Sequence, residues 1–97
     1  MRINLTKKYY TRAERVFGRL CQESGVPFRS KVKLGGREVD FVIGKYAIEI
    51  DGHPQSVAKN DWLVAEGYVP VHFTNGEIIN NRNIVKELIR KYGYISI

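Results

Sequence analysis

The sequence contains a single cysteine, Cys21, and no long run of apolar residues. One cysteine excludes a disulfide framework within the chain and a zinc site built from several thiolates. No stretch reaches the roughly 18 apolar residues that a membrane-spanning helix needs. No apolar segment follows the first charged residues, as a signal peptide would require. We therefore expect a cytoplasmic protein without a membrane partner.

Acidic residues are scarce in the first third of the chain. Residues 1–37 contain ten Lys and Arg but only two Glu, whereas residues 38–97 contain six Lys and Arg and eight acids. A basic segment beside an acidic cluster suits an enzyme that acts on phosphodiesters, because cations hold the phosphate backbone and carboxylates hold a metal. The same charges also fit a basic protein whose lysines lie on solvated faces.

The sequence shows no internal repeat, low-complexity tract or linker, so we expect one domain over residues 1–97. Apolar residues at helical spacing predict helices over 11–24, 56–67 and 81–93. Apolar runs and alternating apolar residues predict strands over 28–34, 37–43, 46–50 and 68–74. The segment Asn75-Gly76-Glu77 is expected to turn the chain, and Pro70 places the last strand at an edge. The predicted fold is α/β, in the order α-β-β-β-α-β-α, with a mixed four-stranded sheet flanked by helices.

Alternation assigns side chains of the first two strands to faces. Within 28–34, one face is predicted to carry Phe28, Ser30, Val32 and Leu34, and the other Arg29, Lys31 and Lys33. Gly44-Lys45 suits a two-residue type II′ turn between the second and third strands. That turn predicts a core face made of Val39, Phe41, Ile43, Ile48 and Ile50.

The opposite face of the same hairpin is predicted to be acidic. The turn places Asp40 opposite Glu49 and Glu38 opposite Asp51. Opposed carboxylates destabilise a sheet unless a cation neutralises them. Lys or Arg can do this, and so can a divalent metal, which binds several carboxylate oxygens and can activate water for phosphodiester hydrolysis. The alternative is a hairpin whose acidic side faces solvent and pairs with nearby lysines.

Several short motifs resemble a known family. "EVDFVIGKYAIEIDG" resembles the core of the PD-(D/E)XK nuclease superfamily, which has the restriction endonuclease-like fold. "TRAE", "VDF", "IEIDGH" and "DWLVAEGYVPVHF" resemble its branch of very-short-patch-repair endonucleases, and the likeness spans about residues 11–90. The resemblance implies a DNA endonuclease that depends on Mg²⁺, with Mn²⁺ as a substitute, and that acts in DNA repair or restriction.

The resemblance also implies a metal site. Asp40 and Glu49 would bind the metal, and the Ile50 carbonyl and Glu14 would complete the site. Glu14 has a second interpretation, because Thr11-x-x-Glu14 has the form of a capping box that begins a helix. One glutamate could serve both roles.

The sequence departs from the superfamily motif at Asp51, where lysine is usual. Lys59 is a candidate for the missing lysine, although a solvated helix lysine is the favoured interpretation. Asp51 could bind a second metal or act as a turn residue before Gly52. His53 follows the strand and could act as a general base or acid, or be an exposed loop residue.

Basic residues predicted to contact phosphates lie in the first third of the chain: Lys7, Lys8, Arg12, Arg15, Arg19, Lys31, Lys33 and Arg37. A homodimer would allow a small nuclease with one site to cut both strands of a duplex. Two alternatives remain, namely a catalytically silent nucleic-acid-binding module of the same fold and a non-nucleic-acid interaction domain with a charged hairpin. The missing lysine at position 51 favours the silent module.

Overall fold

A computed structural model of the protein describes residues 10–51 and 56–95, except for the side chains of Asp51 and Ile95. The elements follow one another as α1 (Arg12–Ser24), β1 (Arg29–Leu34), β2 (Arg37–Ile43), β3 (Tyr46–Asp51), α2 (Val57–Ala65), β4 (Val69–Thr74), α3 (Asn75–Asn80) and α4 (Arg82–Ile95). The predicted α/β fold is confirmed, with one added helix.

The added helix is α3, where the sequence predicted a turn. Thr74 Oγ1 accepts a hydrogen bond from the Glu77 amide at 3.1 Å, and Glu77 Oε1 accepts one from the Thr74 amide at 2.8 Å. This reciprocal pair is a capping box, which satisfies two amides that a helix start leaves unpaired. The prediction of a simple turn was wrong because it weighed Gly76 and overlooked the Thr74-x-x-Glu77 spacing.

The four strands form one mixed sheet in the order β1-β2-β3-β4. β1 with β2 and β2 with β3 are antiparallel, whereas β3 and β4 are parallel and are connected through α2. Ile43 pairs with Tyr46 across the predicted two-residue turn, and Gly44 has a φ of +56° there. Pro70 lies in β4, which is an edge strand as expected.

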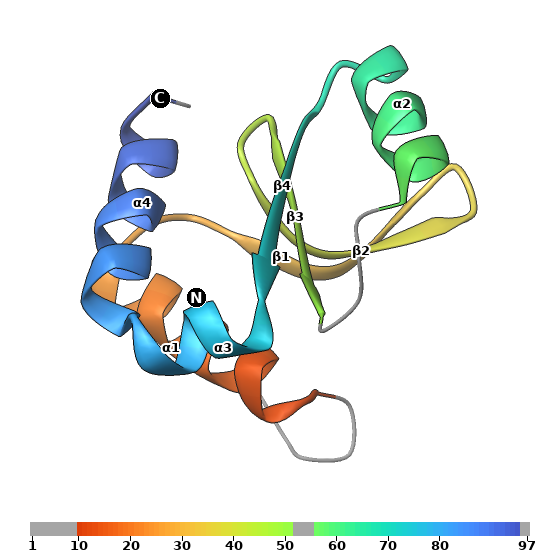
Figure 1. Ribbon diagram of the computed structural model, residues 1–97. Helices are drawn as coiled ribbons and strands as arrows, with labels where there is room; N and C mark the ends of the chain where they lie inside the picture. Colours follow the sequence, from red (N-terminus) through yellow and green to blue (C-terminus); the bar gives the residue numbers. More distant parts are fainter. Residues whose placement is uncertain (1–9, 52–55, 96–97) are drawn as a thin grey trace.

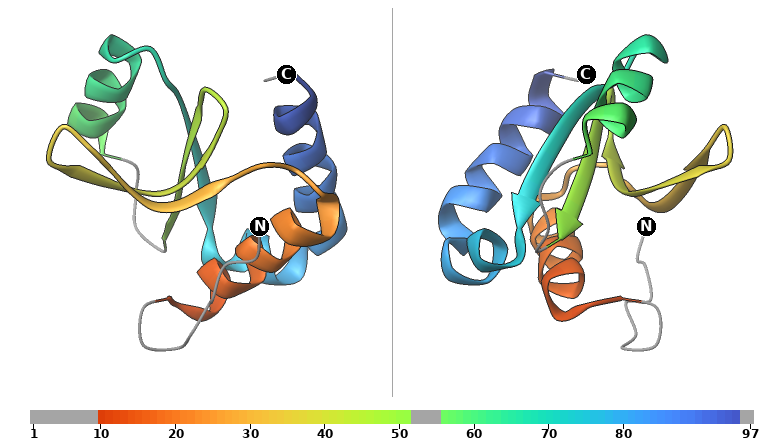
Figure 2. Two further views of the ribbon diagram at one scale, coloured as in Figure 1. Left: turned by 180° about the vertical axis from the view of Figure 1, so that it is seen from behind. Right: turned by 45° about the vertical axis from the view of Figure 1, so that its right-hand side comes forward.

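Helices cover both faces of the sheet (Figures 1 and 2). Each face has its own apolar cluster. α1, α3 and α4 contact one another and pack on one face, while α2 lies on the other. The larger cluster contains twelve buried residues, including Phe17, Phe41 and Ile89. The smaller cluster, beneath α2, is Val39, Val42, Ala47 and Leu63. None of the helices in the described parts is long and apolar enough to cross a bilayer.

The apolar side chains of the β1–β2 hairpin pack on one face of the sheet at one end of the hairpin and on the other face at its tip. Phe28 and Phe41 pack against the larger cluster, but Val32 and Val39 pack in the smaller cluster under α2. Residues two apart in a regular strand share a face. The prediction that Val39 shares a core face with Phe41 was therefore wrong, as was the single face from Phe28 to Leu34.

The change of face occurs where Lys31 and Asp40 lie opposite each other. The register pairs Ser30 with Phe41 and Val32 with Val39, which places Lys31 opposite Asp40 between them. Lys31 has a φ of +50°, and it is the one non-glycine residue with positive φ in the described chain. This left-handed conformation costs on the order of 1 kcal/mol for a residue with a Cβ.

Packing under α2 holds the tip of the bent hairpin. The Arg37 guanidinium carbon lies 5.2 Å from the centre of the Trp62 ring. A Cβ added at Gly35 would come within 2.9 Å of the same ring, so glycine is needed for this close approach. Contact with α2 therefore helps to offset the strain at Lys31.

Gly93 in α4 provides a test of the packing between α4 and the loop before β1. A Cβ at Gly93 would lie 2.5 Å from Val26 Cγ1, whereas a Cβ at Gly76 in α3 would meet nothing closer than 3.9 Å. We expect Gly93→Ala to lower the free energy of unfolding by about 1–3 kcal/mol through overpacking. Gly76→Ala is the control and should be neutral or stabilising, since alanine favours helix. Urea unfolding measures both, and equal stabilities would contradict the packing.

Candidate metal and nucleic-acid site

Glu14 begins the site at the first turn of α1. Its Oε1 accepts a hydrogen bond from the Thr11 amide at 2.8 Å, and Thr11 Oγ1 accepts one from the Glu14 amide at 3.2 Å. Its Oε2 accepts a hydrogen bond from Lys31 Nζ at 3.3 Å. Glu14 is 5% exposed and is the only buried charged residue in the described chain. The predicted capping box is confirmed, and the same carboxylate faces the site.

Asp40 lies where β2 separates from β3. The backbone ladder between these strands runs from Phe41–Ile48 to Ile43–Tyr46 and does not continue to Asp40 and Glu49. Instead, Asp40 Oδ2 accepts a hydrogen bond from the Ile50 amide at 2.8 Å. The side chain thus replaces a backbone acceptor, which holds the Asp40 carboxylate between the two strands.

The environment of Asp40 disfavours its charged form. Burial, the largest cause, and the nearby Glu49 and Glu14 carboxylates together raise the pKa of Asp40 to about 7. The hydrogen bond from the Ile50 amide lowers the pKa and offsets part of this rise. Asp40 and Glu49 are therefore close enough to repel each other when both are ionised. The sequence analysis depended on these two acids lying on the same side of the sheet, and the structure brings them together.

Lysine neutralises Glu49 from the other side of the site. Glu49 Oε1 is buried and forms an ion pair with Lys59 Nζ. Lys59 Nζ also donates to the Glu38 carbonyl oxygen at 2.6 Å. The first turn of α2 is fixed by Ser56 Oγ, which accepts a hydrogen bond from the Lys59 amide at 3.2 Å. Glu14, Asp40 and Glu49 together form an acidic centre. Lys59 contacts this acidic centre instead of extending into solvent.

The donor set can be compared with the needs of a metal. In the described part of the chain, no group of three or more His, Cys, Asp or Glu side chains is arranged to hold one. Mg²⁺ does not need such a group, because it keeps several waters and binds through one or two carboxylates. Asp40 and Glu49 supply hard oxygen donors of that kind. They fit Mg²⁺ or Mn²⁺, provided that Lys59 moves away from Glu49 Oε1 or shares it.

Other predicted members of the metal site are only partly described. Ile50 contacts Asp40 through its amide and pairs in register with Phe73 of β4. Asp51 closes β3 and pairs in register with Thr74, but its side chain is outside the described atoms. His53 also lies outside the described residues.

The predicted basic residues separate into three places. Arg12 and Arg19 are exposed on α1, next to Arg15, whose Nη1 donates to the Tyr10 carbonyl at 2.9 Å. Lys33 and Arg37 lie near the hairpin tip. Lys31 is in the acidic centre. Lys7 and Lys8 fall outside the described residues.

The sequence analysis assigned Lys31 to a basic strand face, and no pattern in "RSKVKL" marks it as different from its neighbours. Its ammonium lies 3.3 Å from Glu14 Oε2, 3.9 Å from Glu38 Oε1 and 5.3 Å from the centre of the Tyr10 ring. The placement follows from the bend in β1, where Lys31 has a positive φ. A glycine at this position would have indicated such a conformation. Lysine gives no such signal.

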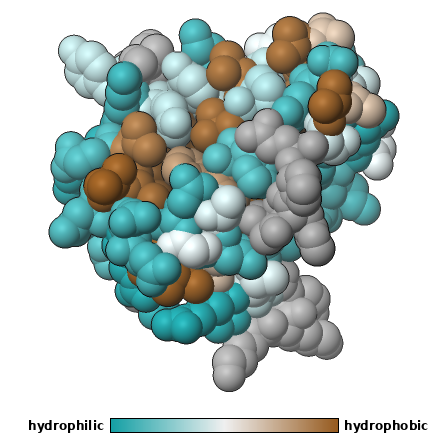
Figure 3. Space-filling view, in the orientation of Figure 1, coloured by the Kyte–Doolittle hydropathy of each residue, from teal (hydrophilic) through white to brown (hydrophobic). Residues whose placement is uncertain are grey.

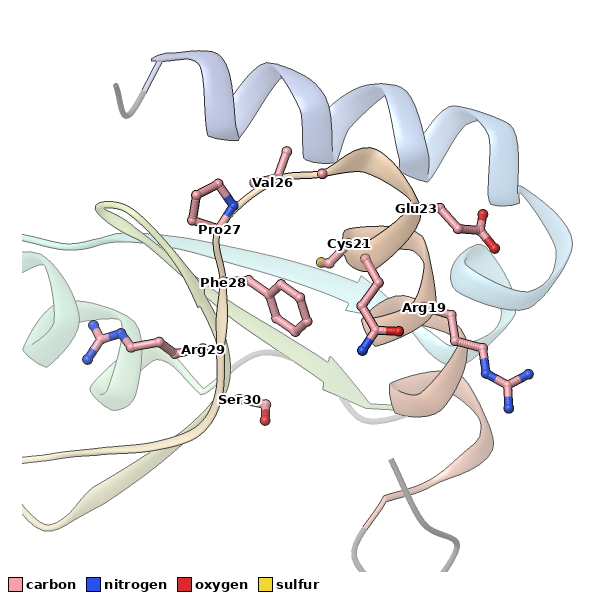
Figure 4. Close-up of a pocket in the computed structure, with 10 residues that line it drawn as sticks. Arg19, Cys21, Glu23, Val26, Pro27, Phe28, Arg29 and Ser30 are labelled. Atoms are coloured by element: carbon pink, nitrogen blue, oxygen red, sulfur yellow. The ribbon is translucent and has the colours of Figure 1, made fainter. Parts of the chain in front are cut away.

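A cavity of about 1110 Å³ lies apart from the carboxylates, between the end of α1 and the start of β1. Figure 4 shows the Phe28 ring and Ser30 directed toward α1, with Arg29 directed the other way. Val57 and Ile84 are exposed. Figure 3 shows hydrophobic patches scattered among hydrophilic residues. The carboxylate site is therefore defined by its chemistry and not by the cavity.

Comparison with solved structures supports the fold. The catalytic domain of the homing endonuclease I-Bth0305I matches this chain with a TM-score of 0.74 and 24% identity, covering 91% of this chain and 99% of that domain. No family model matches the sequence, and no curated protein matches it. The likeness shows a shared α/β fold, with a mixed four-stranded sheet between helices.

The raised pKa of Asp40 predicts how stability changes with pH in metal-free buffer. The folded protein binds the Asp40 proton more tightly than the unfolded chain, so this contribution is complete below about pH 4 and is lost as pH rises through about 7. We expect the Tm of the wild type to fall from pH 5 to pH 8 by about 4–8 °C more than that of Asp40→Asn, which corresponds to roughly 1 kcal/mol after discounting for solvent screening.

The wild type and Asp40→Asn share all other titrating groups, so the difference between their Tm values reports on Asp40. Glu87→Gln on the exposed face of α4 is the matched control and should keep the wild-type dependence on pH. Thermal unfolding followed by circular dichroism gives the three Tm values at each pH. Parallel Tm curves for the wild type and Asp40→Asn would show that Asp40 is not held in this environment.

Proposed function

We propose that the protein is a metal-dependent endonuclease that hydrolyses DNA phosphodiester bonds. The observation that carries the proposal is the pair of carboxylates, Asp40 and Glu49, which converge where β2 leaves β3 and are flanked by Lys31 and Lys59. A pair of carboxylates beside cations suits a divalent metal and a phosphate together. The structural likeness to a homing endonuclease catalytic domain supports the same assignment.

The proposed roles follow from the contacts. Asp40 and Glu49 would hold Mg²⁺ or Mn²⁺, with Glu14 and Asp51 supporting the site. The metal would supply charge neutralisation and acidify the attacking water. Ile50 fixes the Asp40 carboxylate through its amide. Lys59 is held by the Glu38 carbonyl. Once its ammonium leaves Glu49 Oε1, Lys59 would orient the attacking water.

DNA would approach from the start of α1. Arg12 and Arg19 are exposed on this helix, and Glu14 on the same helix faces the carboxylates. A DNA backbone that passes the start of α1 would contact these arginines on the exposed side of the helix and the proposed metal on its buried side. The proposal also includes three finer points. They are a role in repair or restriction, membership of the very-short-patch-repair-like branch, and a homodimer that cuts both strands.

The catalytically silent module remains the second candidate, and a specific observation favours it. Position 51 is Asp in this chain, and both lysines near the site contact protein carboxylates. A module of this kind would bind DNA through the α1 arginines, while its acids would be neutralised by lysine alone.

A nicking assay separates the two candidates. We expect the wild type to relax supercoiled plasmid in Mg²⁺ or Mn²⁺, and the Asp40→Asn/Glu49→Gln double variant to be slower by at least about 100-fold, since it loses the charges that hold the metal. Glu66→Gln, at the exposed end of α2, is the control and should cut at the wild-type rate.

Two further readouts accompany the assay. DNA binding in EDTA should persist in the double variant, and Mg²⁺ should raise the Tm of the wild type but not that of the double variant. A wild type that binds DNA but never cuts in either metal would support the silent module. Absence of both cutting and binding would support the charged interaction domain.

The arginines of α1 predict a dependence of DNA binding on salt. Each phosphate contact releases condensed counterions, so the Arg12→Gln/Arg19→Gln variant should bind more weakly, with a log–log salt slope smaller by about 1–2. Lys91→Gln, exposed on α4, should leave the slope unchanged. Fluorescence anisotropy from 50 to 300 mM KCl measures the slope, and an identical slope in the double variant would place the DNA elsewhere.

A further inference from the structure

The acidic centre contains a second lysine whose position calls for an explanation. Lys31 adopts a φ of +50° within β1, a conformation that residues with a Cβ rarely adopt. Strained backbone of this kind persists where the surrounding structure fixes it, and it is enriched at functional sites. The strain at Lys31 coincides with the point where β1 faces Asp40.

The bend directs the Lys31 side chain toward α1. Ser30 Oγ is hydrogen-bonded to the Tyr10 hydroxyl at 2.7 Å, and the Lys31 ammonium lies over the ring of the same tyrosine. Consecutive residues of a regular strand point to opposite faces, so both could not reach Tyr10 without the bend. The outcome is an ammonium ion beside Glu14, with Asp40 directly across the hairpin.

The Lys31 ammonium is charged and is not saturated by protein acceptors. An ammonium has three N–H donors. Within the described residues it makes one hydrogen bond, to Glu14, while Glu38 lies 3.9 Å away. The side chain keeps 31% of its surface exposed, so a substrate oxygen can reach it.

Lys59 differs from Lys31 in this respect. Its ammonium contacts two protein oxygens, Glu49 Oε1 and the Glu38 carbonyl, and the first belongs to a proposed metal ligand. Lys59 is therefore placed on the metal side of the site. Lys31, which contacts neither Asp40 nor Glu49 through a hydrogen bond, remains available for the phosphate.

We propose that Lys31 is a catalytic residue that donates a hydrogen bond to a non-bridging oxygen of the scissile phosphate. This inference rests on the proposed nuclease function and adds the substrate contact to it. The ammonium forms no covalent bond and transfers no proton. It stabilises the charge that builds on the phosphate oxygens as water attacks, as preorganised donors do in other active sites. Glu14 holds the ammonium in place, and the bend in β1 carries it into the centre.

Single-turnover cleavage of a duplex tests the contact. Lys31→Met should cleave about 100–1,000-fold more slowly than the wild type, the usual cost of removing one such donor. Lys31→Arg should recover at least about a tenth of the wild-type rate. Lys91→Met is the control, because Lys91 is exposed on α4 and is not among the residues proposed to contact DNA, and it should cleave within about 3-fold of the wild type.

A modified phosphate distinguishes contact from a structural effect. At the bond that the wild type cuts, each non-bridging oxygen is replaced in turn by a methyl group, which gives two methylphosphonate diastereomers. Methyl substitution of the oxygen that Lys31 contacts should slow the wild type about 100-fold more than it slows Lys31→Met, whereas substitution of the other oxygen should slow both proteins to within about 3-fold of the same extent. An unchanged preference in Lys31→Met would overturn the proposal, even if that variant were slow.

A third variant tests whether slow cleavage results from misfolding. Lys31→Gly suits the positive φ, which offsets part of the loss of the ion pair with Glu14, so it should be more stable than Lys31→Met and still cleave slowly. DNA binding in Ca²⁺ should change by less than about 3-fold in every Lys31 variant. Lys31→Met and Lys31→Gly cleaving at the rate of Lys91→Met would overturn this inference alone, while a wild type that does not cleave would overturn the proposed function.

Discussion

Carboxylates that lie close together out of water must be neutralised, and this electrostatic constraint governs the centre of the protein. Glu14, Asp40 and Glu49 come from α1, β2 and β3, and burial with mutual repulsion raises the pKa of Asp40 to about 7. Lys31 and Lys59 approach from β1 and α2 and pair with two of the three acids. Five secondary-structure elements therefore converge through charge on a sheet whose faces are otherwise held by apolar packing.

The same constraint shapes the sheet. Asp40 uses its side chain to accept the Ile50 amide, so β2 and β3 can separate without leaving that amide unsatisfied. Opposite Asp40, the bend at Lys31 turns the rest of the hairpin toward α2, where Val39 joins the smaller cluster. Opening the strands and bending the hairpin at one level creates the space in which the carboxylates lie. A regular hairpin would have paired Asp40 with Glu49 directly and closed that space.

The arrangement also suggests how one site can serve two states. Without a metal, lysines supply the positive charge that the acids require, and the domain can remain folded. With a metal on Asp40 and Glu49, Lys59 would be released from its ion pair and become able to position water. Lys31 would keep its place beside Glu14. Neutralisation by Lys59 therefore competes with the metal for Glu49, whereas Lys31 pairs with Glu14 and does not occupy Asp40 or Glu49.

Much of this protein followed from local patterns. Periodicity predicted the α/β order, the spacing Thr11-x-x-Glu14 predicted a capping box, and Gly44 predicted the two-residue turn, because each feature depends on residues close in sequence. The α3 helix was open to the same reasoning through Thr74 and Glu77, and Gly76 obscured it. The alternation of acids also indicated correctly that Asp40 and Glu49 lie together.

The tertiary structure alone decided the placement of Lys31, the break between β2 and β3, and the move of Val39 to the second cluster. Each depends on a backbone bend at a lysine whose sequence neighbours give no sign of it. The bend is maintained by distant contacts, with Glu14 on α1 and with Trp62 on α2 near the hairpin tip. Sequence patterns record which residues prefer a strand, but the energy that strains one of them comes from elements far along the chain.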